Sequence, residues 1–189
     1  MRKTGAILFS VLALSIAANS QIPTTGNVFI GYSYARGAAF TGTVNRSLNM
    51  WGWEASAEGK MMPWISAVAD LDWHYGSRTF STCAGNLCGR KKLTLNASLN
   101  HLLFGPRASI TVGRYTPFAE VLIGVAHESD SGGGISNSDT KFSTAIGAGV
   151  DYKLIKGVAL RVQGDSIHTN LFDLGRNDLR LTTGIAFKF

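Results

Sequence analysis

Acidic residues recur at alternate positions within otherwise apolar segments, and basic residues do the same toward the C-terminus. Carboxylates at this density could form a catalytic acid–base pair or a metal site, or they could form buried ion pairs with Arg and Lys. The residues concerned are Glu54, Glu58, Asp70, Asp72, Glu120, Asp151, Arg161, Asp165, Arg180 and Lys188. Because they come from many separate segments rather than from one motif, we expect a packed polar interior and assign no catalytic, metal-binding or cofactor-binding residue.

Two cysteines, Cys83 and Cys88, lie close together in a stretch rich in Gly, Ser, Asn and Thr. A zinc site would need four good ligands, and no His or further Cys stands nearby at zinc-finger spacing. In an exported chain this pair predicts a local disulfide.

Export is predicted by the N-terminus. Arg2 and Lys3 precede an apolar stretch over residues 5–18, and Ala18 and Ser20 supply small residues where a signal peptidase cleaves. We therefore expect residues 1–20 to be a signal peptide and residues 21–189 the mature domain. The stretch is too short for a transmembrane helix, for which about 20 residues are needed. The formal net charge of +6 is spread along the chain rather than clustered, which argues against a nucleic-acid partner.

The elements that must position the charged residues have a period of two, which indicates β-strands rather than helices. In the last of them Leu179, Leu181 and Ile185 alternate with Arg180 and Lys188. The same split predicts seven further strands, at about residues 27–35, 51–58, 65–75, 92–104, 117–128, 141–153 and 158–169. In the fourth, Leu93, Leu95, Ala97 and Leu99 form the expected apolar face, opposite Thr94, Asn96, Ser98 and Asn100.

Nearly uncharged apolar faces, repeated on eight strands, favour an antiparallel up-and-down barrel that spans a membrane, an all-β fold. Short connections at residues 59–63 and 154–157 would face the periplasm, and long loops at residues 36–47, 76–91, 129–140 and 171–177 would face outward. Residues 106–116 are long for a periplasmic turn unless the flanking strands extend into them. Tyr and Trp cluster at predicted strand ends, as expected of two membrane interfaces.

Residues 161–170 and 177–189, together with residues 117–125 and 145–152, resemble strands of the outer-membrane β-barrel family, which includes small OmpA-like and OmpX-like barrels. The resemblance implies a Gram-negative outer-membrane location and contact with lipid and lipopolysaccharide. Phe187 and Phe189 resemble the C-terminal signal read by the barrel assembly machinery. We expect neither the peptidoglycan-binding domain of the OmpA-like members nor an oligomer, so a monomeric barrel is the expectation.

For function, the sequence favours a structural or surface-interaction protein with a plugged polar lumen and ligand-facing outer loops, since loops on rigid scaffolds commonly carry function. A narrow small-solute channel is one alternative. A lipid A-modifying enzyme is another, with His168 near a predicted strand end beside Ser166 and Asn170. Such a His would need a neighbouring hydroxyl and an orienting carboxylate, and Thr169 and Leu171 break the pattern of the known deacylases, so no enzyme is predicted.

Overall fold

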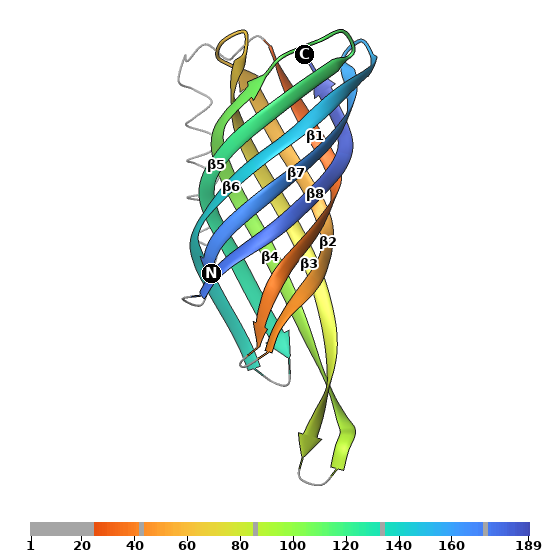
Figure 1. Cartoon of the computed structure of the whole chain (residues 1–189), viewed down its shortest axis with the longest axis vertical. Helices are drawn as coiled ribbons and strands as arrows, with labels where there is room; N and C mark the ends of the chain where they lie inside the picture. The colour runs from red at the N-terminus through yellow and green to blue at the C-terminus, as the bar shows by residue number, and fades with distance from the viewer. Residues whose placement is uncertain (1–24, 42–43, 85–86, 133–134, 172–173) are drawn as a thin grey trace, which may run out of the picture.

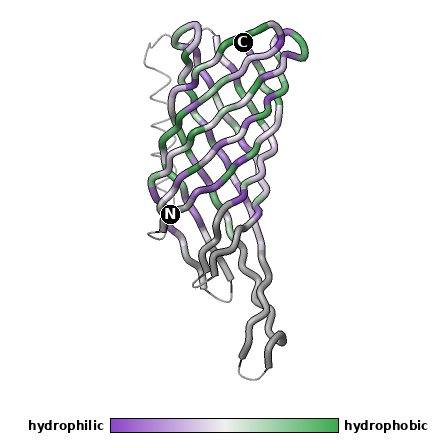
Figure 2. Tube along the Cα trace, in the orientation of Figure 1, coloured by the Kyte–Doolittle hydropathy of each residue, from purple (hydrophilic) through white to green (hydrophobic). Residues whose placement is uncertain are grey.

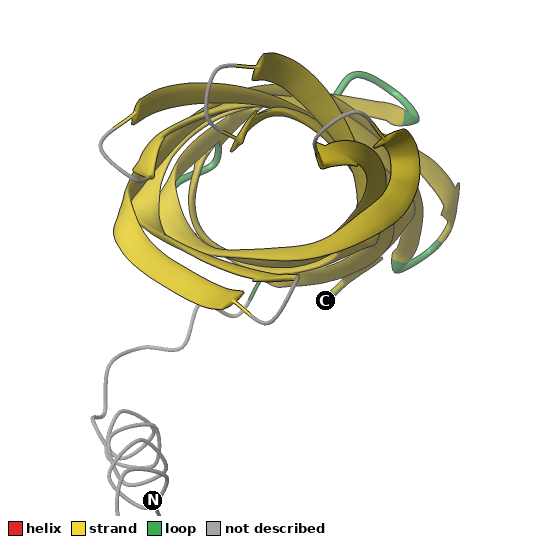
Figure 3. Ribbon diagram, turned by 90° about the horizontal axis from the view of Figure 1, so that it is seen from below, coloured by secondary structure: helices red, strands yellow, loops and turns green. Residues whose placement is uncertain are grey.

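The computed structural model describes residues 25–41, 44–84, 87–132, 135–171 and 174–189, which form one closed barrel of antiparallel strands (Figures 1 and 3). The eight strands are β1 (Gly26–Thr41), β2 (Val44–Lys60), β3 (Ile65–Ala84), β4 (Leu87–Ser109), β5 (Tyr115–Gly132), β6 (Ile135–Ile155), β7 (Val158–Leu171) and β8 (Leu174–Lys188). Each strand pairs with its sequence neighbours, which confirms the predicted eight-stranded barrel. Within the described residues, no helix has both the length and the apolar character needed to cross a membrane.

The barrel closes because β1 pairs with β8 as well as with β2. Gly31 and Gly184 face each other at this seam. A Cβ atom on Gly184 would lie 2.2 Å from the carbonyl oxygen of Ile30, so the close approach of the two strands requires glycine there. Closure pairs both edges of the described sheet, as a lipid environment demands.

Alternate side chains of every strand point in opposite directions, and this produces the two faces of the wall. Ile146 is 67% exposed and Val162 51%, whereas their neighbours in the lumen, such as Arg161 at 1%, are buried. Hydrophobic and hydrophilic residues accordingly alternate along the strands in Figure 2. The outer surface is thus an apolar band, and the charged residues face the interior.

Apolar side chains also occupy the lumen, in three small buried groups between the polar residues. The groups are Ala35, Met50, Leu99 and Ala126; Val68, Leu103, Leu122, Ala145 and Ile167; and Phe29, Ala159 and Ala186. Side chains therefore fill the interior at several levels.

The predicted orientation of β4 is wrong where its side chains are described. Leu99, expected on the apolar outer face, is fully buried in the lumen, and Leu102 and Phe104 face outward instead. The inward residues of this strand are Leu99, His101, Leu103 and Arg107. Hydropathy does not fix the phase of this strand, because the inward residues Leu99 and Leu103 are as apolar as the outward residues Leu102 and Phe104.

The predicted long outer loops are largely strand. β1 continues to Thr41, and β2 begins at Val44. In the same way β3 continues to Ala84, and β4 begins at Leu87. The Gly, Ser and Thr residues of these extensions are paired with the neighbouring strand through their backbones. The extensions of β3 and β4 reach well beyond the barrel wall (Figure 1). At the other end β4 reaches Ser109 and β5 starts at Tyr115, so the strands do extend into residues 106–116.

Aromatic rings gather on the outward face toward both ends of the wall. Trp53 and Trp73 lie with ring centroids 6.4 Å apart on the half nearer the outer extensions, and Tyr115 and Tyr152 lie 5.1 Å apart at the short-turn end. The backbone register places Cys83 opposite Cys88. The side chains of both cysteines, like the predicted signal peptide at residues 1–20, lie outside the described part of the structure.

Candidate functional site

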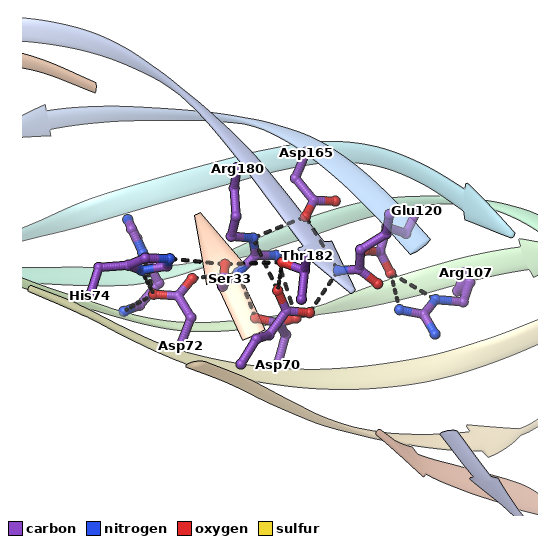
Figure 4. Close-up of polar contacts among 12 residues, drawn as sticks. Ser33, Asp70, Asp72, His74, Arg107, Glu120, Asp165, Arg180 and Thr182 are labelled. Carbon is purple, nitrogen blue, oxygen red and sulfur yellow. Dashed lines mark hydrogen bonds and ion pairs between the residues drawn. The ribbon is translucent and has the colours of Figure 1, made fainter. Parts of the chain in front are cut away.

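A charged cluster around Arg180 occupies the middle of the lumen (Figure 4). Arg180 on β8 is fully buried. Its Nε donates to Asp165 Oδ2 at 2.9 Å, its Nη1 donates to Asp70 Oδ1 at 3.0 Å, and Nη1 also donates to Asp72 Oδ2. A single guanidinium thus joins β8 to β7 and, across the lumen, to β3.

Glu54 and Gln163 complete this cluster. Glu54 on β2 accepts hydrogen bonds from the Gln163 amide at 2.6 Å and from the Thr182 hydroxyl at 2.7 Å, and it lies 3.4 Å from Arg180 Nε. The strand pattern explains the position of each residue, since all of them occupy inward positions of their strands. Four carboxylates surround one guanidinium, so the cluster depends on Arg180 for charge compensation.

Two histidines flank the cluster on the side of the outer extensions. His74 Nδ1 lies 3.2 Å and His101 Nδ1 2.8 Å from the same Asp72 oxygen, and His74 Nε2 lies 2.9 Å from the Ser33 hydroxyl. Ser33, His74 and Asp72 therefore have the connectivity of a catalytic triad. All three are fully buried, and the Ser33 hydroxyl also lies 3.0 Å from the Thr182 hydroxyl, so the group is engaged within the polar network of the lumen.

Asp72, His74 and His101 also offer three candidate metal-ligand atoms within 4.8 Å of one another. The geometry fits a cation poorly, because the second oxygen of Asp72 accepts a hydrogen bond from Arg180. A guanidinium on the same carboxylate repels a divalent ion. The arrangement instead fits a polar network that binds β1, β3, β4 and β8 together.

A second charged cluster lies toward the short-turn end of the lumen. Arg107 on β4 donates from Nε to Glu120 at 2.7 Å and from Nη1 to Glu58 at 2.9 Å. Arg161 on β7 donates from Nε to Asp151 at 2.7 Å, and Lys188 Nζ lies 2.9 Å from the same carboxylate.

Two inward phenylalanines hold these guanidiniums in place. The Arg107 guanidinium carbon lies 4.2 Å from the centroid of the Phe118 ring, and that of Arg161 lies 4.9 Å from the Phe29 ring. Cation–π contact adds to the ion pairs and fixes the direction of each arginine.

The structure places all ten charged residues singled out in the sequence on the inner face of the barrel, nine of them buried and Lys188 partly exposed. They fall into two clusters: Glu54, Asp70, Asp72, Asp165 and Arg180 in the middle, and Glu58, Glu120, Asp151, Arg161 and Lys188 near the short turns. Sequence reasoning missed Arg107, because it lay in a presumed turn. It also missed His101, because the prediction assigned the wrong residues of β4 to the inner face. A strand that continues through Pro106 with Arg107 on its inner face places His101 on that face as well.

His168, the candidate for lipid-modifying chemistry, lies on the outward face of β7. Its Nδ1 is 2.7 Å from the side-chain oxygen of Asn177 on β8, and both residues are exposed. Among the described residues, the partner of the His168 imidazole is this amide oxygen, rather than the hydroxyl and the carboxylate that a hydrolytic base requires; the Ser143 hydroxyl donates to the His168 carbonyl at 3.4 Å. The arrangement therefore gives no geometric support to a catalytic role for this residue.

A closed antiparallel barrel with an apolar exterior and a charged interior defines the class of transmembrane β-barrels. Residues 4–189 match the outer membrane protein beta-barrel domain family, and the chain belongs to that family. It is accordingly a protein of the Gram-negative outer membrane. No curated protein matches the sequence.

Several solved barrels share the fold at low sequence identity. Neisserial surface protein A is 14% identical with a TM-score of 0.65, over 87% of this chain and 97% of that one. Ail, the attachment invasion locus protein of Yersinia pestis, in complex with the heparin analogue sucrose octasulfate, is 16% identical with a TM-score of 0.57, over 87% and 98%. The outer membrane protease OmpT of Escherichia coli is 9% identical with a TM-score of 0.51, over 92% and 99%. At these identities the likeness concerns the fold alone.

Proposed function

We propose that this protein is a non-enzymatic surface-interaction barrel: a plugged lumen makes it a rigid platform, and its outer strand extensions bind an extracellular partner. The plug is supported by Arg180, which is fully buried and bonded to carboxylates on opposite walls. The ion pairs of Arg107 and Arg161 add a second barrier toward the short turns. Both layers argue against the alternative of a small-solute channel.

The observation that carries the binding role is the hairpin formed by the outer parts of β3 and β4, which protrudes further from the barrel than the other strands (Figure 1). Residues 76–92 of this hairpin contain Arg78, Arg90, Lys91 and Lys92 and no acidic residue. Pairing of Thr82 with Lys91 and of Ser81 with Lys92 keeps the segment extended. An extended arm with four cations and no counter-charge in its own sequence is suited to a polyanion.

We infer that the partner is a sulfated or phosphorylated polysaccharide at the cell surface. Sulfate and phosphate groups are the ligands that clustered Arg and Lys bind best. The Ail structure that shares this fold holds a sulfated heparin analogue, which makes the same chemistry a reasonable candidate here.

The test compares two matched variants of the refolded full-length barrel on immobilised heparin. Replacing Arg78, Arg90, Lys91 and Lys92 with Gln removes the hairpin charge, and replacing Lys60, Arg114, Lys153 and Lys156 with Gln removes the same charge at the short-turn end. We expect the unmodified protein and the short-turn variant to elute at the same salt concentration, and the hairpin variant at a much lower one. Equal elution of the two variants would contradict the proposal.

The remaining partners follow from the location. We propose that the exposed apolar band contacts membrane lipid and lipopolysaccharide, that the barrel works as a monomer without a cofactor, and that the barrel assembly machinery recognises β8. Phe187 and Phe189 are both at least half exposed, which leaves their rings open to that machinery. Replacing both with Ser should lower the amount of barrel in the outer membrane while leaving refolding in detergent intact, and unchanged membrane levels would contradict recognition through these rings.

A further inference from the structure

The short-turn end of the lumen contains a cavity of about 320 Å³ that neither the fold nor the proposed surface role requires. This is the periplasmic end of an outer-membrane barrel. The second charged cluster forms the floor of the cavity, and its wall is built by the start of β1, the ends of β2 and β8 and the turns after β4 and β6. The volume is at the lower limit for small-molecule sites and suits a compact ligand.

The cavity has an excess of positive charge. Among the described residues that line it, the basic side chains are Lys60, Arg107, Arg114, Lys153, Arg161 and Lys188, and the acidic ones are Glu58 and Asp151. Both acids are already engaged, Glu58 by Arg107 and Asp151 by Arg161 and Lys188. Within the described part of the chain, Lys60, Arg114 and Lys153 form no ion pair.

Hydrogen bonds between main-chain groups fix the backbone at these three basic residues. The Lys153 amide donates to the carbonyl of Arg114 at 2.8 Å, and the Lys60 amide donates to the carbonyl of Thr25 at 3.0 Å. The turn after β4 contains Gly113 at φ 63°, a left-handed conformation that brings Arg114 to the mouth of the cavity at no steric cost. The wall also carries hydroxyl groups, among them Thr111 and Thr116, whose oxygens lie 3.2 Å apart.

Arg161, which lines the floor of the cavity, has a hydrogen-bond donor without an acceptor in the described part of the chain. Arg161 is 99% buried, and its Nη1 has no hydrogen-bond partner among the described residues, whereas its Nε and Nη2 are both engaged by Asp151. A buried guanidinium N–H without a partner is costly, and an acceptor at the cavity floor would relieve that cost.

We propose that this cavity binds a phosphoryl group, presented by a small phosphate ester of the periplasm or by the headgroup of a phospholipid in the inner leaflet. Lys60, Arg114 and Lys153 form the rim that attracts the anion, the wall hydroxyls donate to its oxygens, and Arg161 closes the floor. A phosphoryl group fits because it combines negative charge with several acceptor oxygens in a compact volume. The site lies at the opposite end of the barrel from the polyanion-binding hairpin and is independent of it.

The experiment uses the ¹⁵N-labelled full chain, refolded in a maltoside detergent that contributes no phosphate, and titrates it with glycerol 3-phosphate. The amides of Gly113 and Gly157, which line the cavity in turns, report binding, and those of Gly52 and Gly124 in the middle of the wall serve as internal references. We expect saturable shifts at Gly113 and Gly157 and none at the references.

Replacing Lys60, Arg114 and Lys153 with Gln should weaken binding by at least about tenfold, since charged hydrogen bonds dominate such sites. Replacing Arg36 and Lys156 with Gln removes exposed charge from residues that are not among those lining the cavity and should leave the affinity unchanged. The three rim residues are exposed, so the variant is expected to fold, and the reference amides verify it. The single variant Lys153→Gln provides a milder form of the same test.

A second titration with phosphatidylglycerol doped into the micelles separates the two sources. If phosphatidylglycerol shifts the same amides and added glycerol 3-phosphate displaces it, the ligand is a lipid headgroup. If only glycerol 3-phosphate shifts these amides, the ligand is a soluble phosphate. Either result supports the site. Absence of saturable shifts with both probes, or equal affinity of the unmodified protein and the rim variant, overturns the proposal.

Discussion

Replacement of Arg180 by Leu is expected to destabilise the barrel more than any replacement of an exposed cation. The change removes the guanidinium that bonds to Asp70, Asp72 and Asp165 and lies 3.4 Å from Glu54, and it leaves these carboxylates buried together. Removing one partner of a buried ion pair costs about 3–5 kcal/mol, because the remaining charge is uncompensated. We therefore expect the free energy of unfolding to fall by at least about 3 kcal/mol.

The assay is equilibrium unfolding in urea of protein refolded into thin phospholipid vesicles, followed by tryptophan fluorescence. Arg36→Leu is the matched control, since Arg36 is an exposed residue of β1 and its loss should change stability by no more than about 0.5 kcal/mol. Adding Asp70→Asn to Arg180→Leu removes one of the uncompensated charges and should restore part of the loss. Similar stabilities for Arg180→Leu and Arg36→Leu, or additive losses in the double variant, would refute the interpretation of the cluster as a charge-compensated plug.

Three further predictions concern other parts of the barrel. Gly147→Ala should destabilise the protein measurably in the same assay, because a Cβ there would lie 1.8 Å from Asp165 Oδ1 in the Arg180 cluster. Gly164→Ala should be tolerated, because its Cβ would meet the end of the Leu181 side chain at 3.2 Å and the Arg180 carbonyl oxygen at an ordinary 3.9 Å. Equal losses of stability in the two variants would exclude this cause. Leu181→Arg on the outward face should lower the free energy of unfolding in vesicles by about 2–4 kcal/mol, and Ile155→Arg near the short turns by about 1 kcal/mol or less, since the penalty for a cation falls toward the interface. A larger loss for Ile155→Arg than for Leu181→Arg would contradict the position of the membrane. Thiol titration of the denatured, unreduced mature protein should detect no free thiol at Cys83 and Cys88, and both after reduction; reactive thiols before reduction would contradict the disulfide.

The architecture could be predicted from the sequence because a barrel repeats one simple rule. Alternation of apolar and polar residues sets which face of a strand meets lipid, and it was clear wherever a charge marked the inner phase, as at Glu54, Asp70 and Arg161. The rule failed in β4, where inward Leu99 and Leu103 are as apolar as outward Leu102 and Phe104. An interior that is partly packed with aliphatic side chains hides the phase of such a strand.

The extent of the strands was the second feature that composition did not reveal. Gly, Ser, Asn and Thr in the segments after β1 and β3 predicted loops, yet pairing continues through them, because antiparallel hydrogen bonding depends on backbone groups that every residue except proline supplies. Pro106 similarly suggested a break, and β4 passes through it with Arg107 directed into the lumen.

The pairing of residues within the charged clusters could not be predicted from the sequence, for a different reason. Membership of the inner face follows from alternation, but which carboxylate meets which cation depends on the register of eight strands and on contacts across the lumen. Arg180 and Asp70 are 110 residues apart, and no local pattern relates them. The triad-like contact of Ser33 with His74 and the cavity at the short-turn end arise in the same way.

The central claim, that the apolar phase of each strand meets acyl chains and the other phase faces a closed lumen, is tested most directly by the isoleucines. Ile30, Ile123 and Ile146 are more than half exposed on the outward face, and Ile167 is 1% exposed in the lumen. In nanodiscs, with isoleucine methyl groups ¹³C-labelled, nuclear Overhauser contacts to lipid methylene protons should appear for the first three and be absent for Ile167. Lipid contacts at Ile167, or water contacts in place of lipid at Ile123 and Ile146, would contradict the account.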